Sequence, residues 1–201
     1  MKIKIIRHSE RLDYANPLYW MVCIGQYWND PPLTRNGTEM ANKYGIELAQ
    51  NNFRPKYIFT SPYQRTIVTA TEIIKSLDNP ELKIEPLLSE YQKSNRHTVS
   101  LYPNGIEATY NNKYVGYNFP ETYDEFEKRV IYILEKLIQD YDDDFAIITH
   151  GEFLKVMTIY LQQKYPDIIL SNSKIQYLAT IEFDFDKNNN TIIENSIKFN
   201  F

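Results

Sequence analysis

The chain alternates short apolar runs with longer segments in which apolar residues recur every three or four positions. Three of the apolar runs have the length of a strand and are rich in β-branched or aromatic residues: Ile3 to Ile6, Tyr57 to Phe59, and Phe145 to Ile148. Continuous apolar runs of this kind are typical of strands that are buried on both faces. We therefore predict an α/β fold, a three-layer sandwich in which helices flank a mostly parallel central sheet.

Four helices are predicted from their apolar stripes and from the signals at their ends. Thr34 is expected to cap the first helix, and Ser61-Pro62 to supply the cap and the first position of the second. The apolar residues behind these signals are Met40, Ala41, Tyr44 and Leu48 in the first helix, and Ile67, Ala70, Ile73, Ile74 and Leu77 in the second. Two further helices are predicted from about residue 121 to 139 and from about residue 152 to 162.

Two segments fall outside this alternation. Residues 89–120 are rich in Tyr, Asn and other polar residues with weak periodicity, which favours a lid-like excursion over one end of the sheet. Residues 177–185 and 191–199 flank the sequence Asp-Lys-Asn-Asn-Asn and are expected to form a C-terminal β-hairpin. Because no repeat or linker divides the chain, we predict one domain over residues 1–201.

Composition narrows the classes of partner. The formal net charge of -4 argues against nucleic acid, because binding it requires a basic surface. No apolar run is long enough to span a bilayer, and the apolar run that ends before Arg7 is too short for a signal peptide, so we expect a cytoplasmic protein. Cys23 is the single cysteine, which excludes an intrachain disulfide and a metal site built from several thiolates. The oligomeric state cannot be predicted from the sequence.

Residues that suit the binding of an anion follow each predicted strand. Arg7 and His8 follow the first strand, Arg65 lies about one turn inside the helix after the second, and His150 ends the third. In an open parallel sheet these positions share one edge, where helix N-termini add partial positive charge. Arg11 could add a third guanidinium. Each residue alone would more often be an ordinary polar residue, but their coincidence at three strand ends predicts a phosphoryl-binding site.

These motifs resemble those of the histidine phosphatase superfamily, which also includes the cofactor-dependent phosphoglycerate mutases. Residues 7–10, Arg-His-Ser-Glu, match the family's Arg-His-Gly-Glu-like motif. The motif Ser-Pro-x-x-Arg-x-x-x-Thr-Ala is intact at residues 61–70, a strand ending in His-Gly occurs at residues 147–151, and residues 30–37 are similar to the family's Pro-Leu-Thr-x-x-Gly segment. The motifs occur in the family's order and span most of the chain.

Within the superfamily the sequence resembles most the branch of ecdysteroid-phosphate phosphatases and the phosphatase domains of T-cell-signalling suppressor proteins. That branch carries an extra arginine at the position of Arg11, and its Glu-Pro-x-Leu-x-Glu-Trp segment is similar to residues 85–91. The resemblance makes His8 the phosphorylated nucleophile and Glu90 the proton donor, and it implies no metal or other cofactor. The residues that it assigns to the phosphoryl group are Arg7, Arg11, Arg65 and His150.

The expected chemistry depends on the charge state of two groups. A neutral imidazole is a competent nucleophile toward phosphorus, and the arginines nearby would lower the pKa of His8 and keep it neutral. Desolvation under the lid is expected to raise the pKa of Glu90 toward a value that suits proton donation. Glu10 and Glu152 are expected to cap or orient, and His97 is interpreted as a lid or loop residue.

We therefore predict a metal-independent phosphomonoester hydrolase that acts on a phosphorylated small molecule or a phosphotyrosine-containing substrate. One alternative is a phosphoglycerate mutase, although residues 89–92 lack the Leu-x-Glu-Arg-like segment of mutases. Another is a non-catalytic phosphate-binding domain, for which Ser9 in place of the family's glycine is the only hint. The aromatic residues that could line a pocket for the leaving group are Tyr14, Tyr19, Trp20, Tyr27, Trp28, Tyr102, Tyr110, Tyr114 and Tyr117.

Overall fold

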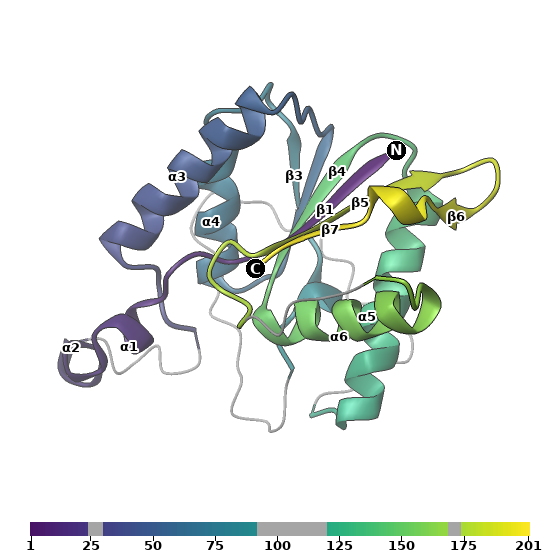
Figure 1. Ribbon diagram of the computed structural model, residues 1–201. Coiled ribbons are helices and arrows are strands. Elements are labelled where there is room, and N and C mark those ends of the chain that lie inside the picture. Colours follow the sequence, from purple (N-terminus) through teal and green to yellow (C-terminus); the bar gives the residue numbers. More distant parts are fainter. Residues whose placement is uncertain (24–29, 92–119, 169–173) are drawn as a thin grey trace.

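The computed structural model describes residues 1–23, 30–91, 120–168 and 174–201 (Figure 1). The strands are β1 (Lys2–Arg7), β2 (Tyr57–Thr60), β3 (Glu81–Ile84), β4 (Phe145–Thr149), β5 (Thr180–Asp186), β6 (Thr191–Ile192) and β7 (Lys198–Asn200). The helices are α1 (Leu12–Ala15), α2 (Pro17–Cys23), α3 (Arg35–Gln50), α4 (Gln64–Ile74), α5 (Tyr123–Asp140) and α6 (Gly151–Lys164), with 3-10 turns η2 (Pro86–Leu88) and η3 (Glu194–Ser196).

The sheet has the strand order β3-β2-β4-β1-β5-β6, and β7 also pairs with β5. Its first four strands are parallel to one another, whereas β5 runs antiparallel to β1. The register aligns Arg7 with Thr149 and Thr60 with Ile148, so the carboxyl ends of β1, β2 and β4 lie side by side. The strand β3 was not predicted, because its sequence Glu-Leu-Lys-Ile mixes charged and apolar residues at the edge of the sheet.

Helices cover both faces of this sheet, which confirms the predicted three-layer α/β sandwich. Alternate residues of each strand point to opposite faces. Ile5 of β1 therefore belongs to the larger core cluster under α5 and α6, and the next residue, Ile6, to the cluster under α3 and α4. Figure 1 shows α3 and α4 on one side of the strands and α5 and α6 on the other. Burial on both faces explains why β2 and β4 are apolar without alternation, whereas β1 includes the charged Lys4, which pairs with Glu182.

The start of α3 agrees with the prediction from the sequence, whereas the start of α4 differs from it. Thr34 caps α3 as predicted, accepting a hydrogen bond from the Gly37 backbone N–H at 2.7 Å. The prediction that Ser61 and Pro62 begin the second helix is wrong, because α4 starts at Gln64. Its first N–H donates to the Asp30 carboxylate at 2.8 and 3.0 Å, while the Ser61 hydroxyl contacts a histidine.

The C-terminal strands form an interrupted hairpin. β5 pairs antiparallel with β6 over two residue pairs, and after η3 the chain returns as β7 alongside the first half of β5. The predicted lid falls almost entirely on residues 92–119, which lie outside the described part of the chain, as do His97 and the tyrosines expected in that segment. Among the residues that the structure describes, no helix is long and apolar enough to cross a membrane.

Candidate active site

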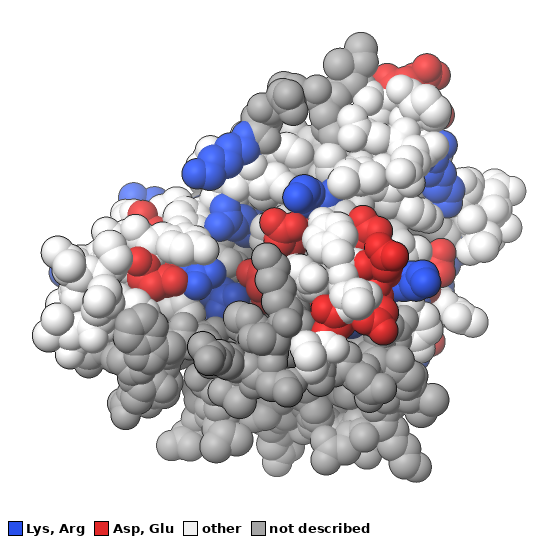
Figure 2. Space-filling model, turned by 90° about the horizontal axis from the view of Figure 1, so that it is seen from below, with Lys and Arg blue, Asp and Glu red and all other residues white. Residues whose placement is uncertain are grey.

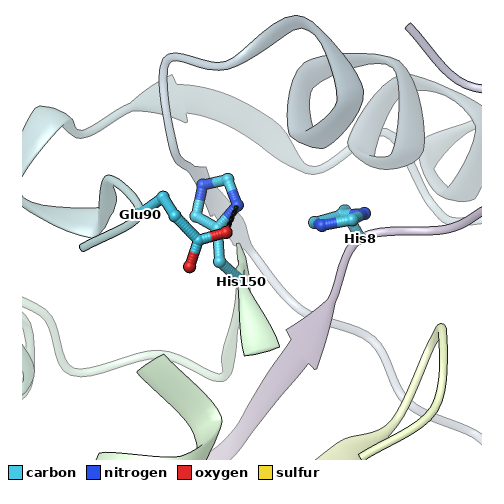
Figure 3. Close-up of side chains that lie close together, drawn as sticks. All are labelled: His8, Glu90 and His150. Carbon is cyan, nitrogen blue, oxygen red and sulfur yellow. Dashed lines mark ion pairs between the residues drawn. The ribbon is translucent and has the colours of Figure 1, made fainter. Parts of the chain in front are cut away.

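Three segments that are far apart in the sequence bring their polar residues together at the carboxyl ends of the parallel strands. His8 follows β1, His150 follows β4, and Glu90 lies shortly after η2. Figure 3 shows the three side chains gathered at one site. The rings of His8 and His150 are edge to face, with centroids 5.4 Å apart. The topology of the sheet thus assembles the residues that the sequence singled out.

His8 is a buried, neutral imidazole in a fixed orientation. Its Nδ1 lies 2.8 Å from the Ser9 carbonyl oxygen, so Nδ1 carries the hydrogen and donates it, and the lone pair is left on Nε2. Burial lowers the pKa of His8 well below its usual value, and the positive charge of Arg65 lowers it further. The expected neutral state of His8 therefore agrees with its surroundings.

Ser9 points away from the histidines. Its hydroxyl donates to the Gly37 carbonyl oxygen at 2.6 Å, and its backbone N–H donates to the Thr69 hydroxyl at 3.0 Å. Gly37 itself has no room for a side chain, because a Cβ would lie 2.3 Å from the Glu10 carbonyl oxygen. The serine that replaces the family's glycine is thus bonded to α3, and it does not crowd the nucleophile.

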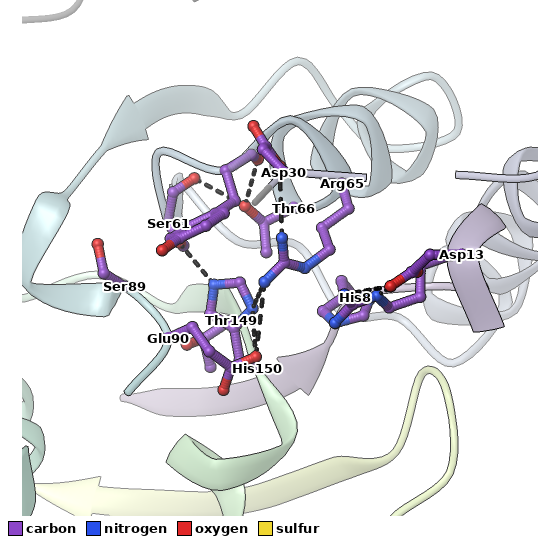
Figure 4. Close-up of polar contacts among 12 residues, drawn as sticks. His8, Asp13, Asp30, Ser61, Arg65, Thr66, Ser89, Glu90, Thr149 and His150 are labelled. Carbon is purple, nitrogen blue, oxygen red and sulfur yellow. Dashed lines mark hydrogen bonds and ion pairs between the residues drawn. The ribbon is translucent and has the colours of Figure 1, made fainter. Parts of the chain in front are cut away.

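His150 is fully buried and contacts a partner at each ring nitrogen. Nε2 lies 2.8 Å from the Ser61 hydroxyl, and Nδ1 lies 3.1 Å from the Arg65 guanidinium (Figure 4). Burial lowers the pKa of His150 to about 4, against the attraction of the Glu90 carboxylate. At neutral pH the ring is therefore uncharged, and these contacts hold it beside His8.

Arg65 is the most deeply placed of the three arginines. Its side chain is 2% exposed, and it contacts the Asp30 carboxylate at 3.3 Å and the Glu90 carboxylate at 3.5 Å. Figure 4 shows the guanidinium between Asp30 and His150. The buried Nε atom of Arg65 has no hydrogen-bond partner among the described residues. Since a buried donor is costly to leave unpaired, this atom is suited to an anionic ligand.

Arg7 and Arg11 complete the positive lining. Arg7 donates to the Ile175 carbonyl oxygen at 2.7 Å and lies 4.5 Å from the centre of the Tyr177 ring, while its buried Nε has no partner in the described part of the chain. Arg11 forms a two-pronged ion pair with Asp13, with both bonds at 2.7 Å. α6 begins beside Arg7, and a Cβ at Gly151 would make an ordinary van der Waals contact with the Arg7 side chain, 3.4 Å from its Nε.

Glu90 differs from its expected charge state. Its Oε2 lies 3.3 Å from the His150 Nδ1 and 3.5 Å from Arg65, and its buried Oε1 has no partner among the residues described. Burial raises the pKa of Glu90, but the contact with His150 and the positive charges of Arg65 and Arg11 outweigh burial and lower the pKa to about 2. The expectation that desolvation raises the net pKa is therefore wrong for the site without substrate, where Glu90 is ionised.

The same three side chains are the one group within the described residues whose spacing could suit a metal ion. Ligand atoms of His8, Glu90 and His150 all lie within 4.8 Å of one another. However, Arg7, Arg65 and Arg11 place positive charge beside these groups, and this charge would repel a metal cation bound among them. The charge of the pocket favours a phosphoryl group over a metal.

Outside the pocket, Glu10 and Glu152 lie at the starts of helices, as expected for residues that cap or orient them. Glu10 accepts hydrogen bonds from the Thr34 hydroxyl at 2.6 Å and from the Asn36 amide at 3.2 Å, at the start of α3. Glu152 lies in the first turn of α6, where a carboxylate interacts favourably with the helix dipole.

On the face seen in Figure 2, acidic and basic side chains are interspersed in the described part, without one broad basic patch.

The aromatic residues proposed for a leaving-group pocket behave differently from one another. Trp20 is 4% exposed, so little of its ring is open to solvent. Tyr14 and Tyr19 are 67% and 50% exposed. Tyr27 and Trp28 lie outside the described residues, together with the tyrosines of the segment 92–119. Tyr14 touches a predicted site residue, its ring centre lying 4.3 Å from the Arg11 guanidinium carbon.

Several residues of the site were missed by sequence reasoning. Tyr177 precedes the antiparallel strand β5, and its ring centre lies 6.0 Å from that of His8. Because β5 runs antiparallel to β1, its beginning shares an edge with the end of β1, a rule that could have found Tyr177. Asp30 and Ser61 stand inside motifs that the sequence singled out, but their contacts depend on tertiary structure.

Comparison with known proteins agrees with this fold. The chain belongs to the histidine phosphatase superfamily, branch 1, whose model matches residues 4–197. It is 51% identical over 201 residues to an uncharacterized phosphoglycerate mutase family protein of Acanthamoeba polyphaga mimivirus, a match that covers 100% of this chain and 98% of that protein. The superfamily resemblance predicted from the motifs is confirmed.

Two further relatives carry a phosphatase name. The chain is 26% identical over 132 residues to the ecdysteroid-phosphate phosphatase of Drosophila melanogaster, covering 52% of this chain and 17% of that protein. Its fold is similar to the ecdysone phosphate phosphatase of Bombix mori in complex with tungstate, with a TM-score of 0.70 and 20% identity over 100% of this chain and 94% of the other. The sequence is thus similar to part of one ecdysteroid-phosphate phosphatase, and the fold is similar to that of an ecdysone phosphate phosphatase.

Proposed function

We propose that the protein is a phosphomonoester hydrolase that works through a phosphohistidine intermediate on His8. One observation carries the proposal: a buried, neutral His8 with its Nε2 lone pair free lies among arginines, two of which have buried Nε donors without a partner in the described residues. A nucleophile beside unused anion donors is the arrangement that phosphoryl transfer requires.

In the first step the Nε2 lone pair of His8 attacks phosphorus, and the bond from phosphorus to the ester oxygen breaks. The leaving oxygen takes a proton from Glu90. Glu90 is ionised beside Arg65, but a bound phosphate ester competes for the positive charge of Arg65 and adds negative charge nearby, which raises the pKa of Glu90. Binding of the substrate, rather than burial alone, therefore allows Glu90 to be protonated before it donates its proton.

In the second step Glu90, now ionised, takes a proton from water. The resulting hydroxide equivalent attacks phosphorus, the bond from phosphorus to the His8 Nε2 breaks, and inorganic phosphate leaves with His8 neutral again. The guanidinium groups of Arg7, Arg11 and Arg65 contact the phosphoryl oxygens throughout. His150 joins them by exchanging one of its ring contacts, with Ser61 or Arg65, for the phosphoryl group. Such groups aimed at developing charge are the largest source of catalysis in many enzymes.

For the substrate we propose a phosphorylated small molecule or a phosphotyrosine-containing molecule. The aromatic rings of Tyr177 and Tyr14 stand beside Arg7 and Arg11, where an apolar or aromatic leaving group could pack. The names of two relatives, which describe phosphatases of ecdysteroid or ecdysone phosphate, are consistent with a bulky apolar leaving group.

The proposal is tested by hydrolysis of p-nitrophenyl phosphate. We expect His8→Ala to abolish activity, since no other nucleophile replaces the imidazole, and Glu152→Gln on α6 to retain it as a matched surface control. A chelator is expected to leave the wild-type rate unchanged. Full activity of His8→Ala, or strong inhibition by a chelator, would contradict the metal-independent histidine mechanism.

A phosphoglycerate mutase is the second candidate, because a relative that is 51% identical carries that family name. Interconversion of 2- and 3-phosphoglycerate at a rate above phosphate release would favour it. A third candidate, a non-catalytic phosphate-binding domain, rested on Ser9, whose hydroxyl is bonded to Gly37 and does not obstruct the pocket. Tight vanadate binding without hydrolysis of any phosphate ester would support that candidate.

A further inference from the structure

Arg129 of α5 is a fully buried arginine that none of the proposed chemical steps uses. Its side chain extends from the helix to the segment that carries Glu90. Nη1 donates to the carbonyl oxygens of Leu87 and Ser89, the latter at 3.0 Å, and Nη2 lies 3.5 Å from the carbonyl oxygen of Glu90 itself. One guanidinium thus holds three backbone carbonyls along the segment that ends at Glu90.

Glu121 supplies the charge that allows Arg129 to be buried. Both of its carboxylate oxygens accept hydrogen bonds from Arg129, with Oε2 at 2.9 Å from Nε and Oε1 bonded to Nη2. A buried ion pair of this kind contributes little net stability compared with apolar residues of the same volume. Its directed bonds to carbonyl oxygens instead fix a geometry, since an arginine fork has donors in set directions.

The segment is also held from the side of the sheet. The Thr149 hydroxyl at the end of β4 donates to the Leu88 carbonyl oxygen at 2.8 Å, and the Tyr91 ring stacks on Phe126 of α5 with centroids 5.3 Å apart. Thr149 immediately precedes His150, so the strand that presents one site residue also anchors the segment that presents the other. Arg129 of α5 holds the same segment from the side of the helix.

We propose that Arg129, held by Glu121, is a positioning residue that sets where the Glu90 carboxylate stands relative to the leaving-group oxygen. The inference rests on the proposed function of Glu90 as proton donor. The hydrogen bonds of Arg129 within the described residues go to Glu121 and to backbone carbonyls. Arg129 acts through the backbone on either side of the Ser89–Glu90 peptide, and a shift of about 1 Å in a catalytic group can cost roughly a hundredfold in rate.

This role has a signature that a purely structural role lacks. Proton donation matters when the leaving group is a strongly basic alkoxide and matters little when it is a weakly basic nitrophenolate. Misplacing Glu90 should therefore lower kcat/KM for an alkyl phosphate while leaving kcat/KM for p-nitrophenyl phosphate nearly unchanged. The ratio kcat/KM reports the transfer to His8 and not the later hydrolysis, in which Glu90 acts as the base. General loss of folding or of phosphate binding would lower both rates together.

The experiment compares kcat/KM on phenethyl phosphate and p-nitrophenyl phosphate for Glu90→Gln, Arg129→Lys and Glu121→Gln. Glu121→Gln keeps the shape of the partner and covers the case in which Arg129→Lys fails to fold. Lys4→Met is the matched control. Lys4 of β1 is also a buried cation with a carboxylate partner, Glu182 of β5, but it lies away from the Glu90 segment. Thermal unfolding of each variant gives the accompanying change in stability.

We expect the ratio of the alkyl to the aryl rate to fall about a hundredfold in Glu90→Gln and at least roughly tenfold in Arg129→Lys and Glu121→Gln, with no change of ratio in Lys4→Met. If Glu90→Gln changes the ratio and neither Arg129→Lys nor Glu121→Gln does, the positioning role is refuted and the proposed function stands. If Glu90→Gln leaves the ratio unchanged, Glu90 is not the proton donor, and the inference is refuted together with that assignment.

Discussion

Acidification should destabilise the fold through the buried histidine His150. The ring is fully buried, and its pKa is lowered to about 4 in the folded protein, whereas an unfolded histidine has a pKa of about 6.5. The unfolded chain therefore binds more protons than the folded one below about pH 6.5. The contribution of His150 to stability is complete above that pH and is lost as the pH falls toward 4.

The size of this loss follows from the two pKa values. At pH 7 the two states differ little in protonation at His150, and at pH 5 the unfolded state is favoured by about 2 kcal/mol relative to pH 7. His8, whose pKa is also lowered by burial, changes stability in the same direction. Because the two histidines overlap, a variant is needed to separate them.

Urea unfolding of the wild type and His150→Asn at pH 7 and pH 5 measures the contribution of His150 alone. Asparagine can keep polar contacts with Ser61 and Arg65 and does not titrate. We expect the free energy of unfolding to fall by about 2 kcal/mol less in the variant than in the wild type. An equal fall in both proteins would show that His150 is not held neutral by the fold.

Two further predictions concern the pocket and its frame. Arg11→Met should lower kcat/KM by about ten- to hundredfold, because one charged hydrogen bond to the phosphoryl group is lost. Arg35→Met, which changes an exposed arginine of α3, should leave kcat/KM unchanged. If Arg11→Met has the same kcat/KM as the wild type, Arg11 is not part of the site. Gly37→Ala should destabilise the protein by about 1–3 kcal/mol or more, because the new methyl group meets the Glu10 carbonyl; an unchanged midpoint of thermal unfolding would contradict the close approach.

The sequence predicted the sheet and the positions of the charged residues because both follow from local patterns. The apolar runs at β1, β2 and β4 reflect burial on both faces, and a motif that follows such a run must lie at the carboxyl edge. His8, Arg65 and His150 were identified in this way, and the structure brings them together.

What the sequence could not predict depends on contacts between distant segments. The pKa of Glu90 is lowered only because Arg65 and His150 approach its carboxylate, and no local pattern reveals that distance. Ser61 has the usual features of a helix cap, yet its hydroxyl contacts His150, while Asp30 accepts from the first N–H of α4. A tertiary contact overrides the local preference in both cases.

The central claim, that His8 carries the phosphoryl group, is tested most directly by trapping the intermediate. The protein would be mixed with a ³²P-labelled aryl phosphate, quenched in alkali within the first turnover, and digested for mapping of the labelled peptide. We predict a label that is stable in base and labile in acid, as a phosphoramidate is, on the peptide that contains His8, and no label in His8→Ala. Label on another residue, or hydrolysis by His8→Ala at the wild-type rate, would contradict the account.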